Sequence, residues 1–452
     1  MTENESIASE SAHSQPAATL QQPGAILRQI VRRNRRRQKA GTYAVCSAHP
    51  AVLDAAIHQA LADDSLLHIE STSNQVNQFG GYTGTTPSQF AAQIRRSAAQ
   101  AGLPDAKVLL GADHLGPYCW RAEPAASAMA KACQLASQSV LAGYQKIHLD
   151  ASMACAGDPT PLPEAVVAER AAMLCQAAEE SFAHLPSGSP SPLYVIGTEV
   201  PVPGGEVAEG QSPVPTRLED LQSSLEEFRK AFMARGLEAA WENVVGVVVQ
   251  PGVEFGDTSI FEYDREKARH LVEGLPNSPR LVYEAHSTDY QSPSSLARLV
   301  EDHFAILKVG PWLTFAFREA VLALGLIESE MPEHKPAGSR VRQVLENEML
   351  RNPEHWRPYY RGDTEQQQFA RAFILSDRCR YYWPRQPVEQ EMKRLLHNLG
   401  GPLPLALLSQ YLPCAYDAIR EGALVNSAGA IIRHHVRRVL RIYARACGTL
   451  AG

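Results

Sequence analysis

Short apolar runs that end on polar or ionisable residues recur between residues 42 and 311. Runs of this length, bounded by turn-forming residues, are typical of strands in a buried parallel sheet. The eight runs are TYAVCSAHP (42–50), LLHIESTSN (66–74), KVLLGADHLGP (107–117), KIHLDASM (146–153), LYVIGTEVP (193–201), VVGVVVQPG (244–252), RLVYEAHSTDY (280–290) and HFAILKVGP (303–311). Each run predicts a strand whose C-terminal end carries polar side chains.

Segments with helical periodicity separate these strands, and several begin near Ser, Thr or Pro and end at Gly, as capped helices do. They include residues 50–62, 86–102, 125–143, 165–182 and 216–236. Strands that alternate with helices form right-handed βαβ units and a parallel sheet. Because all eight strand ends are polar, we expect a ring around a barrel mouth, not the single crevice of a doubly wound sheet. The predicted fold class is α/β, a (β/α)₈ TIM barrel over residues 41–322.

The two ends of the chain differ from this pattern. Residues 323–452 contain amphipathic helical segments, which we expect to form a helical C-terminal region packed on the barrel. Residues 1–40 are expected to be a disordered or helical basic tail, because seven basic residues lie between Arg28 and Lys39. Such a run is typical of an RNA-binding or membrane-surface arm, or of a solvated helix. We favour the solvated helix, since no aromatic residues are interleaved with the arginines.

Composition narrows the functional class. The 452 residues carry a formal net charge of −6, which argues against a nucleic-acid-binding protein. Eight cysteines without regular spacing predict reduced thiols and a cytoplasmic location. No apolar run approaches the roughly 18 residues of a membrane helix, and the polar, acidic N-terminus does not resemble a secretory signal. We therefore expect a soluble cytoplasmic protein with no membrane partner.

The polar strand ends supply candidate chemistry, because TIM-barrel active sites lie at the C-terminal ends of the strands. The candidates are His49, Glu70, Asp113, His114, Asp150, Glu199, Gln250, His286 and Lys308. Histidines among carboxylates are suitable ligands for a divalent metal ion. A structural hydrogen bond is the alternative role for any one of them. For His114 and His286 together we favour metal binding.

Two further segments are candidates for substrate binding. The loop STSNQVNQFGGYTGTTP, with Asn74 and Gln75, carries amides and hydroxyls suited to sugar hydroxyls, although it also fits an ordinary polar loop. Ser287, Thr288 and Lys308 follow the last two strands, where barrels commonly bind phosphate, although Lys308 also fits a structural partner for a carboxylate. A metal, a carboxylate base and a phosphate site together indicate enolate chemistry on a sugar phosphate.

Long motifs in the chain resemble the GatZ/KbaZ family of tagatose-bisphosphate aldolase-type proteins. They are CSAHP, SNQVNQFGGYTG, GADHLGP, HLDASMACAGDP, GTEVPVPGGE, QPGVEF, YEAHSTDYQ, ILKVGP and LSDRCRYYWP. The resemblance runs from about residue 41 to the C-terminus, and the family is similar in turn to class II, zinc-dependent aldolases.

This resemblance implies roles for individual residues. Asp113 matches the proton-transferring aspartate of class II aldolases, and His114 and His286 match zinc ligands. Glu199 matches a strand-five glutamate, and with Asp113 and Asp150 it completes the candidate catalytic carboxylates. The strand-six histidine ligand of those enzymes is missing here. Gln250 or Glu199 is the candidate replacement ligand, and weak metal binding is the alternative.

The resemblance also implies two activities. Some members of the family look like non-catalytic subunits of a separate class II tagatose-1,6-bisphosphate aldolase in galactitol or N-acetylgalactosamine breakdown. Others look like 4-epimerases that interconvert D-tagatose 6-phosphate and D-fructose 6-phosphate. We expect the metal-dependent epimerase, acting by retro-aldol chemistry, with zinc as a candidate metal. The accessory subunit with a class II aldolase partner is the alternative, and a homo-oligomer is a candidate assembly.

Overall fold

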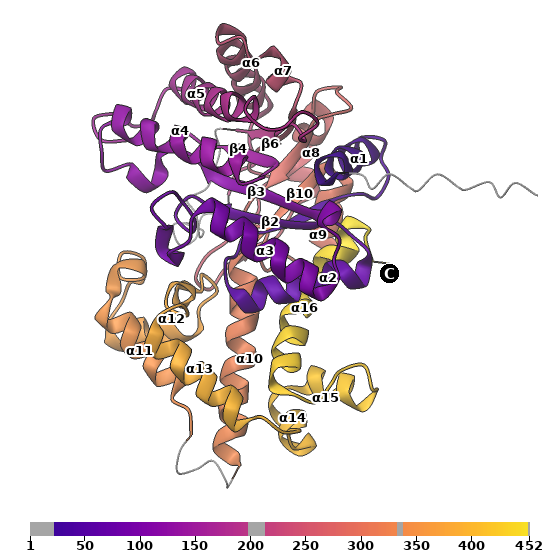
Figure 1. The fold of residues 1–452 in the computed structure, drawn as a ribbon, viewed down its shortest axis with the longest axis vertical. Coiled ribbons are helices and arrows are strands. Elements are labelled where there is room, and N and C mark those ends of the chain that lie inside the picture. Colours follow the sequence, from indigo (N-terminus) through magenta and orange to yellow (C-terminus); the bar gives the residue numbers. More distant parts are fainter. Residues whose placement is uncertain (1–21, 198–212, 332–337, 451–452) are drawn as a thin grey trace, which may run out of the picture.

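Eight parallel strands close into a barrel in the order β1-β10-β9-β6-β5-β4-β3-β2 (Figure 1). The computed structural model describes residues 22–197, 213–331 and 338–450. The strands are β1 Thr42–Val45, β2 Leu67–Thr72, β3 Val108–Leu115, β4 Lys146–Leu149, β5 Leu193–Ile196, β6 Val244–Val248, β9 Val282–Ala285 and β10 Phe304–Val309. Since β1 pairs with both β2 and β10, no edge is left open. The predicted TIM-barrel fold is confirmed.

Each predicted apolar run contains one barrel strand, but the sequence pattern did not predict two further short strands. These are β7 Glu254–Phe255 and β8 Ile260–Phe261, which pair antiparallel in the loop after β6. Strands of two residues are too short to show a hydrophobic period. The start of α3 has a clear sequence signal, because Thr86 and Gln89 form a capping box there.

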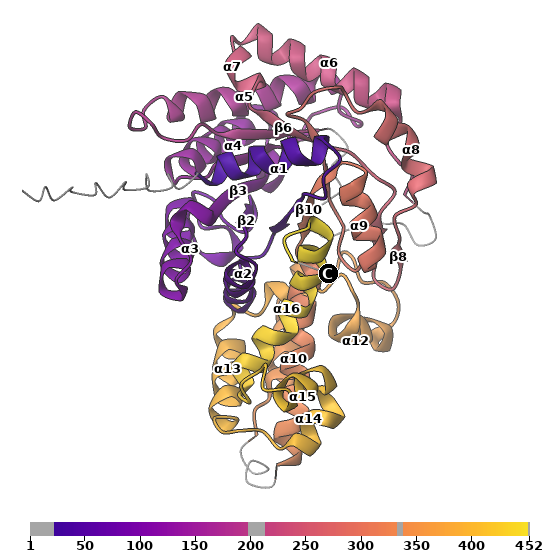
Figure 2. The same ribbon diagram turned by 90° about the vertical axis from the view of Figure 1, so that its right-hand side faces the viewer.

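Helices cover the outside of the barrel and shield its apolar strands (Figures 1 and 2). They are α2 Pro50–Asp63, α3 Pro87–Ala101, α4 Ala125–Leu141, α5 Glu164–Phe182, α6 Leu218–Ala234, α7 Glu238–Trp241, α8 Arg265–Gly274, α9 Pro293–Glu301 and α10 Pro311–Glu330. Within the described part of the chain, no helix has the length and apolarity needed to cross a bilayer.

The basic N-terminal segment folds into α1, Pro23–Arg35, which packs against the end of the barrel where the strands begin. Leu27 and Val31 are buried in one apolar cluster with barrel residues such as Leu109. Arg35 donates hydrogen bonds to the carbonyl oxygens of Pro276 and Ser278. The helix is therefore amphipathic, and part of its positive charge binds barrel carbonyls. Residues 1–21 lie outside the described residues.

The C-terminal region forms a helical lobe joined to the barrel by two long helices (Figures 1 and 2). Its remaining helices are α11 Val341–Arg351, α12 Thr364–Phe373, α13 Gln386–Asn398, α14 Leu405–Tyr411, α15 Pro413–Arg420 and α16 Ala428–Cys447. Helix α16 packs on α10, α2 and α9, and the Gly41 N–H bonds the Cys447 carbonyl at 3.0 Å. The boundary expected at residue 322 falls inside α10, so barrel and lobe share this helix.

Candidate active site

Charged side chains stack inside the half of the barrel nearest the C-terminal ends of the strands, because alternate strand residues point to the same face. This period places Glu70 of β2 above His68, and His148 of β4 above Lys146. Glu284 and His286 follow the same two-residue spacing at the end of β9, and all six lie in buried positions. The interior nearer the N-terminal ends of the strands is apolar and includes Leu109, Val195 and Ile306. The barrel interior is thus apolar at the end where the strands begin and carries a layer of charged side chains, the ionic layer, at the end where they finish.

Two lysines neutralise part of this layer. The ammonium group of Lys146 lies 2.6 Å from Glu70 Oε1 and 2.6 Å from Glu284 Oε2. Lys308 contacts Glu70 Oε2 and lies 2.8 Å from Asp113 Oδ1. Burial alone would raise the pKa of Glu70, but Lys146 and Lys308 lower it to about 2. Gly111 leaves room for this side chain, because a Cβ atom there would lie 2.8 Å from Glu70 Cγ.

Three imidazoles meet above the lysines, with ring centroids 4.9 to 5.4 Å apart. They come from β3, β4 and the end of β9, and a carboxylate holds one nitrogen of each ring. The pairs are His114 Nδ1–Asp150 Oδ2 at 2.8 Å, His148 Nδ1–Asp113 Oδ1 at 3.2 Å and His286 Nε2–Glu284 Oε1 at 3.1 Å. Carboxylate–histidine pairs of this kind orient metal-binding imidazoles in proteins.

The free nitrogens of this cluster fit a divalent metal ion. His148 Nε2 is buried with no hydrogen-bond partner, although a buried polar atom normally has one. His148 Nδ1 lies 3.2 Å from Asp113 Oδ1 and 3.3 Å from the backbone N of His114, so Nε2 carries a lone pair in the tautomer whose Nδ1–H donates to Asp113. Ligand atoms of Asp113, His148, Glu284 and His286 all lie within 4.8 Å of one another. Imidazole and carboxylate together are typical zinc ligands.

The charge balance supports the same conclusion. Glu70, Asp113 and Glu284 contact the two ammonium groups of the layer, and Asp150 contacts His114, so with neutral imidazoles a divalent cation would balance the four carboxylates. Burial lowers the pKa of His286 to about 4, which leaves a neutral imidazole ready to bind a metal. For His114, burial lowers the pKa, but the neighbouring Asp113 and Asp150 carboxylates raise it overall.

Two residues of this cluster and its cavity have a strained, left-handed backbone. His114 and Ser287 both have positive φ angles, 46° and 51°, at the ends of β3 and β9. Left-handed backbone at a residue other than glycine costs energy and is concentrated at functional sites. Gly116 lets the chain leave β3 beside Asp150, since a Cβ atom there would lie 1.6 Å from the Asp150 carbonyl oxygen.

Several predicted site residues meet in this cluster, and one proposed ligand does not. Asp113, His114, Asp150 and His286 lie together as expected. Gln250 is engaged elsewhere, because its Oε1 accepts the N–H groups of residues 252 and 253 and closes the turn after β6. Glu199, the other proposed ligand and a candidate catalytic residue, lies outside the described residues.

The third imidazole is instead His148, which the sequence analysis did not select as a ligand. The signal was present in the spacing: Lys146, His148 and Asp150 alternate along one run, so all three face the same side of β4. Only the barrel shows that this side faces His114 and His286.

The residues expected to bind phosphate are mostly engaged in other contacts. Lys308 is an internal partner of the Glu70 and Asp113 carboxylates. Thr288 is buried and donates its hydroxyl to the Lys308 carbonyl at 2.6 Å. Ser287 lines the cavity above the cluster. The N–H groups of residues 310 and 312, at the start of α10, donate to the Asp289 carboxylate at 2.9 and 2.8 Å.

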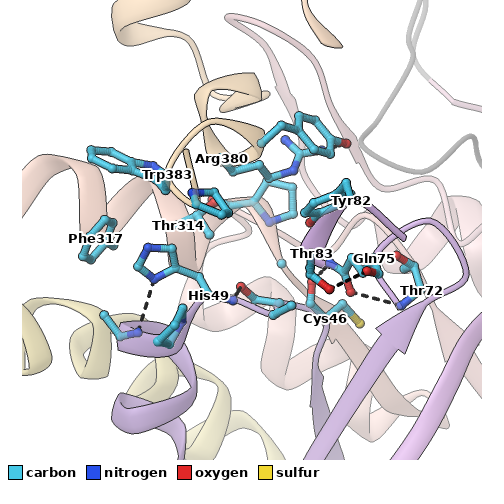
Figure 3. Close-up of a pocket in the computed structure, with 18 of the residues that line it drawn as sticks. Cys46, His49, Thr72, Gln75, Tyr82, Thr83, Thr314, Phe317, Arg380 and Trp383 are labelled. Carbon is cyan, nitrogen blue, oxygen red and sulfur yellow. Dashed lines mark hydrogen bonds between the residues drawn. The ribbon is translucent and has the colours of Figure 1, made fainter. Parts of the chain in front are cut away.

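A cavity of about 800 Å³ lies above the cluster, between the barrel mouth and the helical lobe (Figure 3). Asp113, His114 and His286 lie at its barrel side. Asn74 and Gln75 also line it, as expected of the loop after β2. However, the Gln75 amide is engaged with the Thr72 N–H at 3.0 Å and the Cys46 carbonyl at 3.3 Å.

The lobe supplies the opposite wall of the cavity, which the sequence analysis did not anticipate. Arg380 belongs to a short 3₁₀ turn, Arg378–Tyr381, and Trp383 follows it. His49 faces these residues from the start of α2, and its ring centroid lies 4.1 Å from that of Phe317 on α10. The cavity is therefore lined by two parts of the chain that are more than 300 residues apart.

Comparison with known proteins agrees with this architecture. A protein from Sinorhizobium meliloti 1021, described as a probable tagatose 6 phosphate kinase, is 41% identical with a TM-score of 0.82; the match covers 90% of this chain and 100% of that chain. A fructose-bisphosphate aldolase from Campylobacter jejuni matches at 14% identity and a TM-score of 0.44, over 83% of this chain and 94% of that one, too distant to inform on activity.

The family comparison covers almost the whole folded chain. The model of the D-tagatose-1,6-bisphosphate aldolase subunit GatZ/KbaZ-like family matches residues 27–448, from α1 in the barrel base to the end of α16. The match therefore includes both the barrel and the helical lobe that together enclose the cavity. The chain belongs to the GatZ/KbaZ-like family.

Proposed function

We propose that the protein is a metal-dependent epimerase that interconverts D-tagatose 6-phosphate and D-fructose 6-phosphate at C4. The observation that carries this proposal is the trio of buried imidazoles, each held by a carboxylate, directly below a cavity. A subunit with a purely structural role has no need of this buried ionic cluster. The related protein from S. meliloti is described with the same sugar phosphate, which supports the choice of substrate.

The proposed metal ligands are His148 and His286, whose ligand atoms lie within 4.8 Å of each other, together with His114, whose ring centroid lies 4.9 Å from that of His286. When bound, a divalent metal supplies Lewis-acid polarisation of the sugar carbonyl and of the oxygen that gains charge next to it. The carboxylates Asp150 and Glu284 act as positioning residues, because they hold the rings of His114 and His286 in one orientation.

We propose that epimerisation proceeds by cleavage and re-formation of the C3–C4 bond. A carboxylate accepts the proton of the C4 hydroxyl, the C4–O bond becomes a carbonyl, and the C3–C4 electron pair moves into an enediolate over C2 and C3. The aldehyde then turns, C3 attacks its other face, and the carboxylate returns the proton to the new hydroxyl. Atoms and charge balance without an oxidant or reductant.

Asp113 is the proposed proton-transferring carboxylate. Burial would raise its pKa, but Lys308 and His114 hold that pKa well below its usual range. It is therefore ionised at neutral pH, which is the state a general base must start from. It also lies 3.2 Å from His148 Nδ1, next to the proposed metal ligands.

The test uses purified full-length protein, stripped of metal and then supplied with Zn²⁺, Mn²⁺, Mg²⁺ or Co²⁺. Conversion of tagatose 6-phosphate is followed as fructose 6-phosphate in a coupled NADPH assay. We expect turnover only with metal, and we expect His148→Ala to lose both bound metal and turnover. His58→Ala is the matched control, since His58 lies on the outer surface of α2 and contacts Asp54 there. Equal metal content in both variants contradicts the ligand assignment.

A second candidate function follows from the family description, which names an aldolase subunit. In that case the protein alone shows no turnover and instead raises the activity or the thermal stability of an added class II aldolase. The same preparation answers both questions when an aldolase arm is added. Stimulation without turnover of its own assigns the accessory role.

A further inference from the structure

We propose that the substrate phosphate binds between Arg380 and Trp383 on the lobe side of the cavity and His49, which faces them from the start of α2, and not at the ends of β9 and β10. This inference rests on the proposed function for its substrate, a sugar phosphate. It concerns a separate feature of the site, namely which part of the fold recognises the phosphate group.

The usual phosphate position of the barrel is already filled. The Asp289 carboxylate accepts the N–H groups of residues 310 and 312 at the start of α10, where an anion would otherwise bind. The ammonium group of Lys308 is engaged with Glu70 and Asp113, and the Thr288 hydroxyl is engaged with a backbone carbonyl. A phosphate placed here would meet the Asp289 carboxylate and would find few free donors.

Arg380 offers the opposite situation. Three of its five N–H donors have partners, namely the carbonyl oxygens of Ser376 and Asp377 and the hydroxyl of Tyr381. Among the described residues, Nε–H and one N–H of Nη2 have no hydrogen-bond partner, and no carboxylate forms an ion pair with the guanidinium group. Nε and Nη2 lie on the same edge of the guanidinium, the edge with which arginine binds a phosphate bidentately. Arg380 lines the cavity.

Trp383 and His49 add neutral donors to the same part of the cavity. The Trp383 side chain is 3% exposed, and its Nε1–H is buried without an acceptor. His49 Nδ1 accepts the Ala51 N–H at 3.3 Å. Burial lowers the pKa of His49 to about 4, so its ring is neutral at pH 7 and its proton lies on Nε2. The two rings are 6.4 Å apart, and both line the cavity.

The geometry of the mouth matches the length of the substrate. His49 lies three residues after Cys46, which lines the cavity beside the ionic cluster. Three residues of chain span at most about 10 Å, and the C4 atom and the phosphorus of a hexose 6-phosphate are separated by only four bonds. Figure 3 shows Arg380 and Trp383 on the wall opposite Cys46 and Thr72. The proposal therefore places the reacting carbons of the sugar at the imidazoles and its phosphate at the lobe wall of the same cavity.

Four carboxylates lie near this position. Asp54 lies at the edge of the cavity and contacts Arg433 Nε at 2.6 Å, while Asp377 contacts Arg318 at 3.2 Å. Asp289 accepts two backbone N–H groups and interacts electrostatically with Arg380, and Glu389 lines the cavity from α13 together with Lys393. Among the described residues, none of the four forms an ion pair with the Arg380 guanidinium. The lobe wall thus presents donors and one unpaired guanidinium, which is the chemistry that selects an anion.

The experiment measures binding of inorganic phosphate to the full-length protein by isothermal titration calorimetry. We expect Arg380→Met to raise the Kd for phosphate roughly 10- to 100-fold, and Trp383→Phe to raise it roughly 3- to 10-fold. The matched controls are Arg420→Met and Trp241→Phe, since Arg420 also stacks on a tyrosine ring and Trp241 packs on Phe232 away from the cavity. Both controls are expected to leave the Kd unchanged.

Two results would overturn the inference. One is an unchanged phosphate Kd in Arg380→Met; the other is a loss of affinity in Ser287→Ala that Arg380→Met does not share. Since inorganic phosphate needs no turnover, this readout is independent of whether the protein is an epimerase. If Arg380→Met fails to fold, Arg380→Lys keeps the charge and is expected to lose roughly tenfold in affinity, because a lysine cannot bind bidentately. Wild-type affinity in that variant overturns the inference as well.

Discussion

Replacing Lys146 by methionine tests whether the ionic layer inside the barrel is a structural element. The ammonium group of Lys146 is fully buried and bridges Glu70 and Glu284, each at 2.6 Å. Methionine has a similar shape but removes the charge, so the two carboxylates keep only Lys308 as a cationic partner among the described residues. Removing one partner of a buried ion pair costs about 3 to 5 kcal/mol, because a desolvated charge is left behind.

The assay is a urea titration at pH 7, followed by circular dichroism and by tryptophan fluorescence, which together test whether unfolding occurs in one step. Lys131→Met is the matched control, since Lys131 forms a partly exposed pair with Glu123 at 2.5 Å and is expected to change stability by less than about 1 kcal/mol. The double variant Lys146→Met/Glu284→Gln removes one charge of each sign and is expected to recover part of the loss. A loss in Lys146→Met no larger than that of the control would refute the reasoning.

Further predictions concern acid stability, catalysis and packing. Because the pKa of Glu70 is about 2 in the fold against an ordinary 4.5, it contributes about 3 kcal/mol that is present above pH 4.5 and lost as the pH falls toward 2; urea titrations between pH 2 and 7 measure this slope, and a flat profile contradicts it. Asp113→Asn is expected to abolish turnover while circular dichroism stays unchanged, and wild-type activity would remove its proposed role. Gly116→Ala is expected to lower the thermal midpoint and the yield of folded protein, because a Cβ atom would meet the Asp150 carbonyl; wild-type behaviour would show that β3 can shift. Gln250→Ala is expected to leave the metal content at the wild-type level, as measured by mass spectrometry, and a loss of metal would restore Gln250 as a ligand.

The sequence by itself determined the barrel and most of the strand-end chemistry. Strand runs and their turn residues are local signals, so the eight strands and the polar ends of β3, β4 and β9 follow from the two-residue period. Asp113, His114, Asp150 and His286 were recognisable because parallel strands in a barrel end at one mouth. Their common placement needed no knowledge of which strands are neighbours.

Only the tertiary structure decided which of these side chains touch. Whether Lys308 meets a phosphate or a carboxylate depends on the register of β10 against the other strands, and the register brings it to Glu70 and Asp113. The same closure brings the His148 ring beside the His114 ring, while the Gln250 side chain bonds to the backbone of the turn after β6. Arg380 lies on the cavity wall because α10 and α16 fold the lobe over the barrel mouth. Contacts between residues hundreds of positions apart are set by helix packing and barrel closure, which no local sequence period encodes.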